Sequence, residues 1–223
     1  TMMTYETTNR ILFAGDGFGS FGALLGSIFD EDVDLSTFED EILRYFSNII
    51  GMYSKMVQRA ITKLNHENLD INVVASTHGP VWRKDPQAII QRYEKWSRNE
   101  AETGAVVALG SMYGNTRRMA EAVADGLCAN GITRLRVLDA SETHVSYFVR
   151  DAWRYKGVVL GAPAYDKGLF PAMQYYADTI DHKDLKHRTS GIFGSSGWSG
   201  GAVKALSSLS ERREWKKVDP VVE

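Results

Sequence analysis

Residues 106–123, VVALGSMYGNTRRMAEAV, place small and hydroxyl-bearing side chains between an apolar run and a helical pattern. The apolar run predicts a buried strand that ends at Ser111, and the later spacing predicts a helix that begins near Asn115. Free backbone N–H groups and the positive end of the helix dipole suit one phosphate at such a junction. The segment lacks the G-x-G-x-x-G pattern typical of pyrophosphate sites and the P-loop lysine. A mononucleotide such as FMN is therefore favoured over NAD or ATP.

Two later loops have a similar character. Residues 161–168, GAPAYDKG, and 194–201, GSSGWSGG, follow apolar runs and carry one aromatic side chain each, Tyr165 and Trp198. Small residues let the backbone approach a flat ring, and aromatic side chains can stack on its face. One such loop alone is equally compatible with a tight turn. Three of them at successive strand ends favour a flavin site, which in a doubly wound sheet lies beside the switch in strand order.

From residue 105 onward, apolar runs alternate with helical patterns. This alternation predicts an α/β fold with a parallel sheet covered on both faces. The expected strands are 105–111, 133–141, 157–163, 189–196 and 216–223, and the expected helices are 115–131, 145–155, 171–180 and 201–213.

The first hundred residues have a different pattern, with only two confident strands, at 10–16 and 71–79. Two strands are too few for a complete sheet. A glycine-rich turn and a helix are expected over 17–30, and further helices over 37–50, 53–66 and 85–101, the last opened by Asp85 and Pro86. The polar stretch at 99–104, NEAETG, predicts a boundary between domains 1–103 and 104–223.

Two residues of the first domain could bind a metal. Asp16 ends one expected strand in LFAGDGFGSFG, and His78 ends the other in ASTHGP. A carboxylate can bridge two cations and an imidazole can bind one. Taken alone, the pair is weak evidence for a metal, because an aspartate at a strand end is more often a helix cap or turn former and a histidine before Gly-Pro is more often a turn residue. Both interpretations remain open at this point.

Composition narrows the class of protein. The chain has 223 residues, 43% of them apolar, and a formal net charge of −2, which gives no reason to expect nucleic acid or an anionic membrane as partner. No apolar run approaches the roughly 20 residues of a membrane helix, and no signal-peptide pattern opens the chain. The single cysteine, Cys128, fits a reducing, cytoplasmic setting, and its helical context predicts a packed thiol.

The loops SMYGNT, APAYD and SSGWSGG together resemble the FMN loops of flavodoxin-like domains, and more narrowly those of flavodiiron proteins, also called A-type flavoproteins. The resemblance implies a flavodoxin-like doubly wound parallel sheet over 104–223, without its last helix. It is preceded by the second half of a metallo-β-lactamase-like αββα domain over 1–103. The residues that the resemblance assigns to FMN are Ser111, Met112, Tyr113, Gly114, Asn115, Thr116, Pro163, Ala164, Tyr165, Asp166, Ser196, Gly197, Trp198 and Gly200.

The same resemblance covers the metal pair. L-F-x-x-D-x-F-G-S-F-G and a later strand ending in H-G-P occur here in the order and spacing of the family. They imply that Asp16 bridges two irons and that His78 is a terminal ligand to one, which would make both residues catalytic. The family's H-x-E-x-D motif is absent from this chain. Two ligands cannot hold a dinuclear centre, so we expect a piece of a longer protein, whose N-terminal half completes the site, in the same protein or as a separate chain.

The resemblance implies an oxidoreductase that reduces dioxygen to water, or nitric oxide to nitrous oxide, with electrons passed through FMN to a diiron centre. It also implies a head-to-tail homodimer, or a dimer of dimers, and an electron donor such as rubredoxin or a reduced deazaflavin. The main alternative is a flavodoxin-like FMN electron carrier whose lactamase-like remnant is structural and metal-free. A metallohydrolase with an accessory flavodoxin domain is disfavoured, because hydrolysis needs no flavin.

Overall fold

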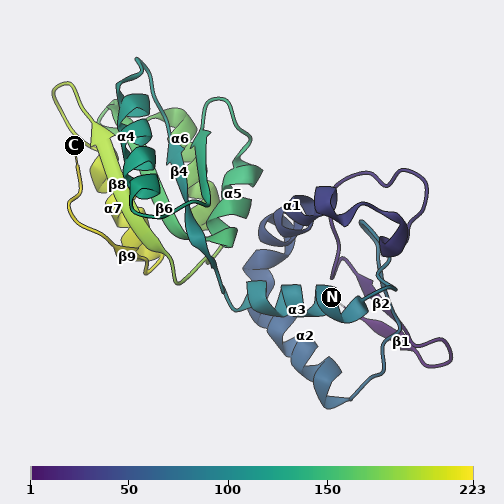
Figure 1. Ribbon diagram of the computed structural model, residues 1–223. Helices are drawn as coiled ribbons and strands as arrows, with labels where there is room; N and C mark the ends of the chain where they lie inside the picture. The colour runs from purple at the N-terminus through teal and green to yellow at the C-terminus, as the bar shows by residue number, and fades with distance from the viewer. Residues whose placement is uncertain (1, 223) are drawn as a thin grey trace. The chain divides into compact units, whose positions relative to one another are not determined.

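The computed structural model describes residues 2–222, and the chain divides between Glu100 and Ala101 into two compact units. The labels of Figure 1 follow the chain from β1 to β9. None of the described helices is both long enough and apolar enough to cross a bilayer.

The second unit is built on a six-stranded sheet in which five strands run parallel in the order β5-β4-β6-β8-β9. The short strand β7 pairs antiparallel with the end of β6. The order reverses between β4 and β6, which is the switch point of a doubly wound sheet. The strands are β4 Glu102–Leu109, β5 Leu135–Asp139, β6 Tyr155–Tyr165, β7 Gly168–Leu169, β8 Thr189–Ser195 and β9 Lys216–Lys217.

Helices lie on both faces of this sheet. The helix α4 crosses one face, and α5, α6 and α7 pack side by side on the other (Figure 1). Residues 105–109 of the central strand β4 are therefore buried on both faces, which explains their continuous apolar sequence. The helices are α4 Asn115–Ala129, α5 Val145–Arg154, α6 Pro171–Asp181 and α7 Ala202–Arg212.

The predicted alternation of strands and helices in this unit is confirmed, with small shifts at the ends of elements. The fifth strand differs most, since β9 has two residues and pairing resumes only at a bridge between Phe193 and Val222. Pro220 lies between these two pairings and has no backbone N–H to donate to a ladder. The last segment therefore pairs with β8 in two separate places.

The first unit has a three-stranded sheet in the order β1-β2-β3, with β1 antiparallel and β3 parallel to β2. Sequence analysis did not identify β1. Along β2, Leu12 and Ala14 point into the core whereas Phe13 is half exposed, the alternation of a strand with one buried face. The elements are β1 Thr4–Glu6, β2 Ile11–Gly15, α1 Leu35–Tyr45, a π-helical turn Phe46–Ile50, a 3₁₀ turn Gly51–Tyr53, α2 Ser54–His66, β3 Val73–Ser76 and α3 Pro86–Ser97.

The three helices of the first unit form where the sequence predicts them. Asp85 caps α3, its carboxylate accepting a hydrogen bond from the backbone N–H of Ala88 at 3.0 Å, and Pro86 occupies the first turn. The core brings aromatic residues together: the Phe18 and Tyr93 ring centroids are 5.0 Å apart, and Phe46 packs edge-on against Tyr93 at 4.9 Å.

The helix expected within residues 17–30 is absent from the structure, which shows an extended loop followed by a single 3₁₀ turn, Asp30–Asp32. Gly22 and Gly26 both have positive φ, 99° and 94°, which a right-handed helix does not allow. The loop instead donates hydrogen bonds to distant elements, from Ser20 N to His78 O at 3.2 Å and from Phe21 N to Glu41 O at 3.5 Å. Tertiary contacts thus determine this backbone.

The prediction of a packed thiol is wrong, because Cys128 is exposed. The buried stripe of α4 consists of Thr116 and Ala120, continued by the half-buried Val123 and Leu127, a spacing of three and four residues. Cys128 lies one residue beyond this stripe and faces solvent. The amphipathic pattern was therefore correctly recognised, but the cysteine was assigned to the wrong side of it.

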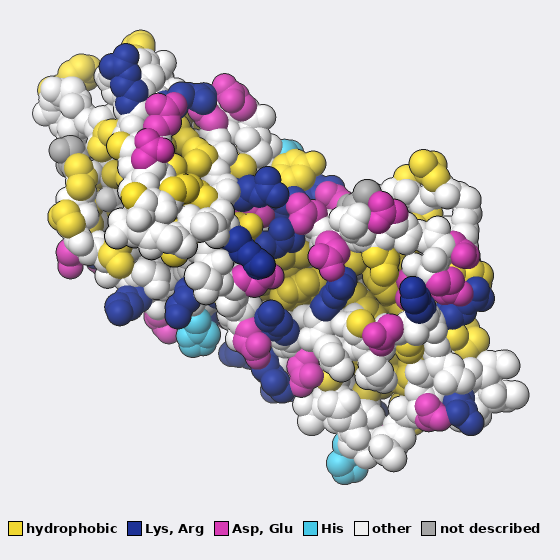
Figure 2. Space-filling model, viewed as in Figure 1, with side chains coloured by type: hydrophobic (Ala, Val, Ile, Leu, Met, Phe, Trp, Pro, Cys, Tyr) yellow, Lys and Arg dark blue, Asp and Glu magenta, His cyan; other side chains and the backbone are white. Residues whose placement is uncertain are grey.

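Figure 2 shows lysine and arginine side chains interspersed with aspartates and glutamates, and neither sign forms a broad patch on this face. Charged side chains of the described residues form surface pairs, such as Arg134 with Glu102 at 2.7 Å and Lys186 with Glu214 at 3.0 Å. Exposed pairs of this kind contribute little to stability, roughly 0–1 kcal/mol each.

Candidate functional site

The carboxyl ends of β4, β6 and β8 converge on one cavity of about 620 Å³ in the second unit. Because the strands are parallel, the loops that follow them emerge at the same edge of the sheet. A volume of this size is typical of small-molecule sites, which span roughly 300–1,000 Å³. The cavity is lined by Met112, Tyr113, Asn115, Thr116, Pro163, Ala164, Tyr165, Asp166, Lys167, Ser195, Ser196, Gly197, Trp198 and Ser199.

The first loop leads into α4 through Gly114, whose φ of 86° places it in the left-handed region that glycine tolerates. The Ser111 hydroxyl accepts a hydrogen bond from Gly114 N at 3.1 Å, which closes the turn. No side chain caps the start of α4. The N–H groups of its first turn have no partner within the helix and, together with the helix dipole, can bind an anion there.

Arg117 anchors this first turn to the neighbouring strand. Its guanidinium donates to the Asp139 carboxylate at 2.7 Å and to Glu142 at 3.1 Å. Asp139 ends β5, is nearly buried, and also accepts a hydrogen bond from Ser141 N at 2.8 Å. These bonds join α4, the helix that follows the first loop, to the end of β5.

The second loop is a two-residue hairpin between β6 and β7. Asp166 and Lys167 both have positive φ, 47° and 65°, as required at the centre of the tight hairpin turns whose twist matches the flanking strands. Next to the turn, Tyr165 is half exposed at the cavity wall. The hairpin therefore presents an aromatic ring on a rigid backbone.

The third loop carries Trp198, which is 96% exposed, the most exposed of the large apolar side chains in the described residues. Its neighbour Gly197 has open space around it, because a Cβ added there would meet no atom within 4 Å. The backbone of this loop is thus accessible to a flat ligand, and the tryptophan is free to cover one.

Eleven of the fourteen residues expected to bind FMN line the cavity; the remaining three, Ser111, Gly114 and Gly200, lie in its loops without lining it. Sequence analysis missed Lys167, Ser195 and Ser199. All three lie within the loops 161–168 and 194–201, but none of them is among the fourteen residues expected to bind FMN. Ser195 falls in both the expected strand 189–196 and the loop 194–201, and in the structure it is the last residue of β8 and lines the cavity.

The residues present fit a flavin mononucleotide. The uncapped start of α4 offers backbone donors for one phosphate, and the wall contains three exposed aromatic rings, Tyr113, Tyr165 and Trp198. The first loop, residues 110–116, contains no lysine. A triphosphate would therefore lack the lysine that pairs with its charge in a P-loop. The backbone donors therefore match a single phosphate, and the aromatic side chains match a planar ring.

The first unit brings Asp16 and His78 together. Because β2 and β3 are parallel neighbours, the turns that follow them are adjacent, and the His78 Nε2 lies 3.5 Å from the Asp16 Oδ1. The Thr77 hydroxyl donates to the same aspartate oxygen at 3.0 Å. Both side chains are more than half exposed, 58% for Asp16 and 56% for His78. They are available to a ligand.

Tyr45 of α1 lies beside this pair, with its ring centroid 5.8 Å from that of His78. Burial raises the pKa of Tyr45 to about 12, and the negative charge of Asp16 adds to the effect. A raised pKa favours the neutral phenol, so the hydroxyl stays protonated throughout the neutral range. Tyr45 therefore faces the carboxylate as a neutral, hydrogen-bearing group.

The described residues do not by themselves form a metal centre. Across residues 2–222 no three histidine, cysteine, aspartate or glutamate side chains lie together as a ligand cluster. Two ligands are fewer than the three or four protein groups that hold a transition metal. Asp16 and His78 can therefore contribute to a metal site only together with further groups.

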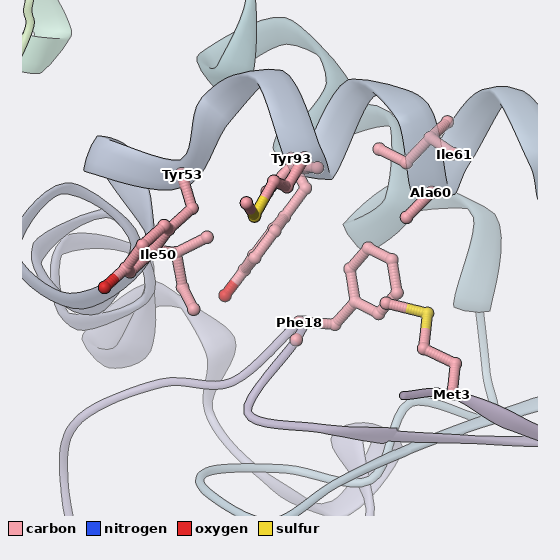
Figure 3. A pocket seen from close by; sticks show the side chains of 10 residues that line it. Met3, Phe18, Ile50, Tyr53, Ala60, Ile61 and Tyr93 are labelled. Carbon is pink, nitrogen blue, oxygen red and sulfur yellow. The ribbon is translucent and has the colours of Figure 1, made fainter. Parts of the chain in front are cut away.

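A smaller, mostly apolar cavity of about 340 Å³ lies in the first unit between the sheet and α2. Figure 3 shows the Met3 side chain reaching toward the Phe18 ring, with Ala60 and Ile61 of α2 above them. The Tyr93 hydroxyl is already used, because it donates to Gly19 O at 3.0 Å. The cavity has apolar walls and lacks a pair of groups that could act as acid and base.

Comparisons with known proteins place these features in a family. The family model for flavodoxin matches residues 107–223. The anaerobic nitric oxide reductase flavorubredoxins of Escherichia coli K12 and Shigella dysenteriae serotype 1 are 29% and 30% identical to this chain. In both cases the match covers 97% of this chain and 47% of the relative. The chain thus spans about half the length of the curated relatives it matches.

Solved structures agree in fold. The rubredoxin oxygen:oxidoreductase of Desulfovibrio gigas superimposes with a TM-score of 0.94 at 21% identity, over 100% of this chain and 56% of that protein. The flavodiiron protein of Giardia intestinalis gives a TM-score of 0.91 at 26% identity, over 99% of this chain and 54% of that protein. These matches confirm an α/β fold with a flavodoxin-like parallel sheet, arranged as in flavodiiron proteins. The chain belongs to the flavodoxin family, and its resemblance to the flavodiiron proteins is confirmed over its whole length.

Proposed function

We propose that this chain binds FMN in the cavity of its second unit and forms the electron-transfer part of a flavodiiron-type oxidoreductase. The observation that carries the proposal is the cavity of about 620 Å³, where three strand ends meet an uncapped helix N-terminus. Membership of the flavodoxin family and the flavorubredoxin relatives support it.

FMN, when bound, supplies one- and two-electron chemistry that no amino-acid side chain offers. The first loop, from Ser111 to Thr116, holds the phosphate with backbone and hydroxyl donors. Tyr165 and Trp198 border the ring and exclude water from it. The loops thereby determine which flavin binds and which of its faces stays accessible.

The substrates we propose are dioxygen, reduced to water, or nitric oxide, reduced to nitrous oxide, at a diiron centre. Asp16 would supply a bridging carboxylate and His78 an imidazole, and their adjacency and exposure support this assignment. The remaining ligands must come from groups outside the described residues, because these two alone cannot hold two metals.

The partners we propose are a second copy of this protein, in a head-to-tail homodimer or a dimer of dimers, and a separate redox donor, either rubredoxin or a reduced deazaflavin. The name of the Desulfovibrio gigas neighbour, rubredoxin oxygen:oxidoreductase, supports rubredoxin in that role. We place the protein in the cytoplasm, where the exposed free thiol of Cys128 would remain reduced.

The second candidate is an FMN electron carrier with no metal. The observation in its favour is that Asp16 and His78 stand without a third ligand among the described residues. The two candidates share the flavin site and differ in metal content. Iron at about two atoms per subunit in protein isolated without chelators supports the reductase, whereas FMN without iron supports the carrier.

Titration of the flavin-free protein tests the shared site. FMN is expected to bind at one per chain, seen as quenching of flavin fluorescence, and to bind at least about tenfold more tightly than riboflavin, because only FMN carries the phosphate. Equal affinity for the two flavins would show that the first loop does not bind phosphate. Absence of any flavin binding would end the proposal.

Replacement of Asp16 by alanine tests the metal site. In protein that is isolated with iron, Asp16→Ala is expected to lower the iron content to below about a tenth, because the bridging ligand is lost, while FMN stays bound. The matched control is Asp70→Ala, which removes an exposed carboxylate that pairs with Arg10 and should retain iron. Full iron content in Asp16→Ala, measured by elemental analysis, would contradict the bridging role.

A further inference from the structure

Ser195 and Thr116 join two loops of the flavin cavity through their hydroxyl groups, which lie 3.1 Å apart. We propose that Ser195 determines the specificity of the site for a phosphorylated flavin, because it orients the Thr116 hydroxyl as a donor to the phosphate. This inference rests on the proposed flavin function and assigns a role to a residue that is not among the fourteen expected to bind FMN.

The two hydroxyls come from different parts of the sheet. Thr116 lies in the first turn of α4 and is only 1% exposed. Ser195 is the last residue of β8, where its register partner is Pro163 of β6. Both side chains line the cavity. The hydrogen bond thus links the first turn of α4 to the start of the loop that carries Trp198.

The direction of this hydrogen bond decides what Thr116 can do. Each hydroxyl has one proton to donate and two lone pairs that can accept. When Ser195 donates to the Thr116 oxygen, the Thr116 proton is left for another acceptor. A phosphate oxygen at the start of α4 is such an acceptor, and its charge makes that bond stronger than one between neutral groups. The buried Thr116 hydroxyl and the partly buried Ser195 hydroxyl are then both hydrogen-bonded.

Without Ser195, the Thr116 hydroxyl loses the partner that orients it. The expected consequence is confined to ligands with a phosphate, because the bond holds Thr116 in the first turn of α4, where we place the phosphate. Ser195 therefore acts as a positioning residue, and its effect should appear as a loss of selectivity between FMN and riboflavin.

The decisive experiment compares FMN and riboflavin affinities by fluorescence titration in Ser195→Ala. FMN affinity is expected to fall about tenfold, as for the loss of one hydrogen bond to a charged acceptor, with riboflavin affinity unchanged. Ser195→Thr keeps the hydroxyl and should restore selectivity. Ser196→Ala, a neighbouring change in the cavity wall, should weaken both flavins alike, if it weakens either.

A second set of variants makes the test independent of the stability of Ser195→Ala. In a Thr116→Val background, where the donor to phosphate is already missing, Ser195→Ala should cause no additional loss of FMN affinity, because the two residues act through one bond. Additive losses would overturn the inference, as would an equal loss for both flavins or unchanged FMN affinity in Ser195→Ala. If the unaltered protein binds neither flavin, the proposed function itself fails. If FMN binds tightly and selectively over riboflavin in Ser195→Ala as well, the proposed flavin site stands and only the role of Ser195 is refuted.

Discussion

Replacement of Asn115 by glutamate is expected to lower the affinity for FMN by at least about a hundredfold. Asn115 is the first residue of α4 and lines the cavity. A carboxylate there would face the phosphate, and two unit charges about 4 Å apart repel by about 4 kcal/mol at an effective dielectric constant near 20. Since about 1.4 kcal/mol corresponds to a factor of ten, even a side chain that swings partly away produces a loss of this size.

The same substitution should leave the fold intact. An acidic residue in the first turn interacts favourably with the helix dipole, so glutamate at position 115 stabilises α4 in the absence of ligand. Riboflavin, which has no phosphate, should bind Asn115→Glu nearly as well as it binds the unaltered protein. The selectivity between the two flavins is therefore expected to disappear or reverse.

Asn130→Glu provides the matched control for Asn115→Glu. It introduces the same charge on the same helix, but at the C-cap of α4, on the far end from the cavity. FMN affinity should be unchanged there, while the helix loses a few tenths of a kcal/mol from the unfavourable dipole interaction. If fluorescence titration gives Asn115→Glu and Asn130→Glu the same affinity for FMN, the phosphate does not lie at the start of α4.

The flavin cavity could be predicted because a parallel sheet collects its strand ends at one edge. The loops after β4, β6 and β8 were recognisable from small residues and single aromatics such as Tyr165 and Trp198, and the alternation of elements placed them together. Within the loop 194–201, however, Ser195 could not be distinguished as a residue of the cavity wall. Its side chain reaches the cavity because β8 ends there, and sequence patterns locate strand ends only to within a few residues.

The first unit was less predictable because its backbone depends on distant contacts. The loop that follows Asp16 is held by hydrogen bonds to residues 20–60 positions away along the chain, such as Ser76 Oγ to Gly17 O at 2.7 Å. Local propensity carries no information about such partners. The strand β1 was missed for a related reason, since its three residues are stabilised by pairing with β2 and show no periodicity of their own.

Replacement of Gly201 by alanine is expected to weaken the binding of FMN and riboflavin together, by about tenfold or more, and to cost roughly 1–3 kcal/mol of stability as overpacking does. Gly201 is the N-cap of α7, and a Cβ there would overlap the carbonyl group of Lys167 in the hairpin of the second loop. A backbone carbonyl cannot swing aside as the end of a flexible side chain can.

The hairpin has little freedom to yield. Tyr165 pairs with Gly168 across the two-residue turn, so a shift of Lys167 would break the register of β6 and β7. The third loop must therefore move instead, and it carries Trp198 away from Tyr165. Because these residues border the ring, both flavins lose affinity, in contrast to Asn115→Glu, which affects only the phosphorylated one.

Gly126→Ala separates this steric effect from the general consequences of replacing a glycine. Gly126 lies inside α4, where an added Cβ would meet no atom within 4 Å. Alanine there should raise the free energy of unfolding by up to about 1 kcal/mol through its higher helix propensity and leave flavin affinity unchanged. Thermal melts should therefore show that Gly201→Ala lowers the stability of the protein and that Gly126→Ala raises it. Flavin titrations should show a loss of affinity in Gly201→Ala and none in Gly126→Ala. If Gly201→Ala retained full affinity for both flavins, the second and third loops would not hold the ring together, and the close approach of Gly201 to Lys167 would serve only the packing of α7 against the hairpin.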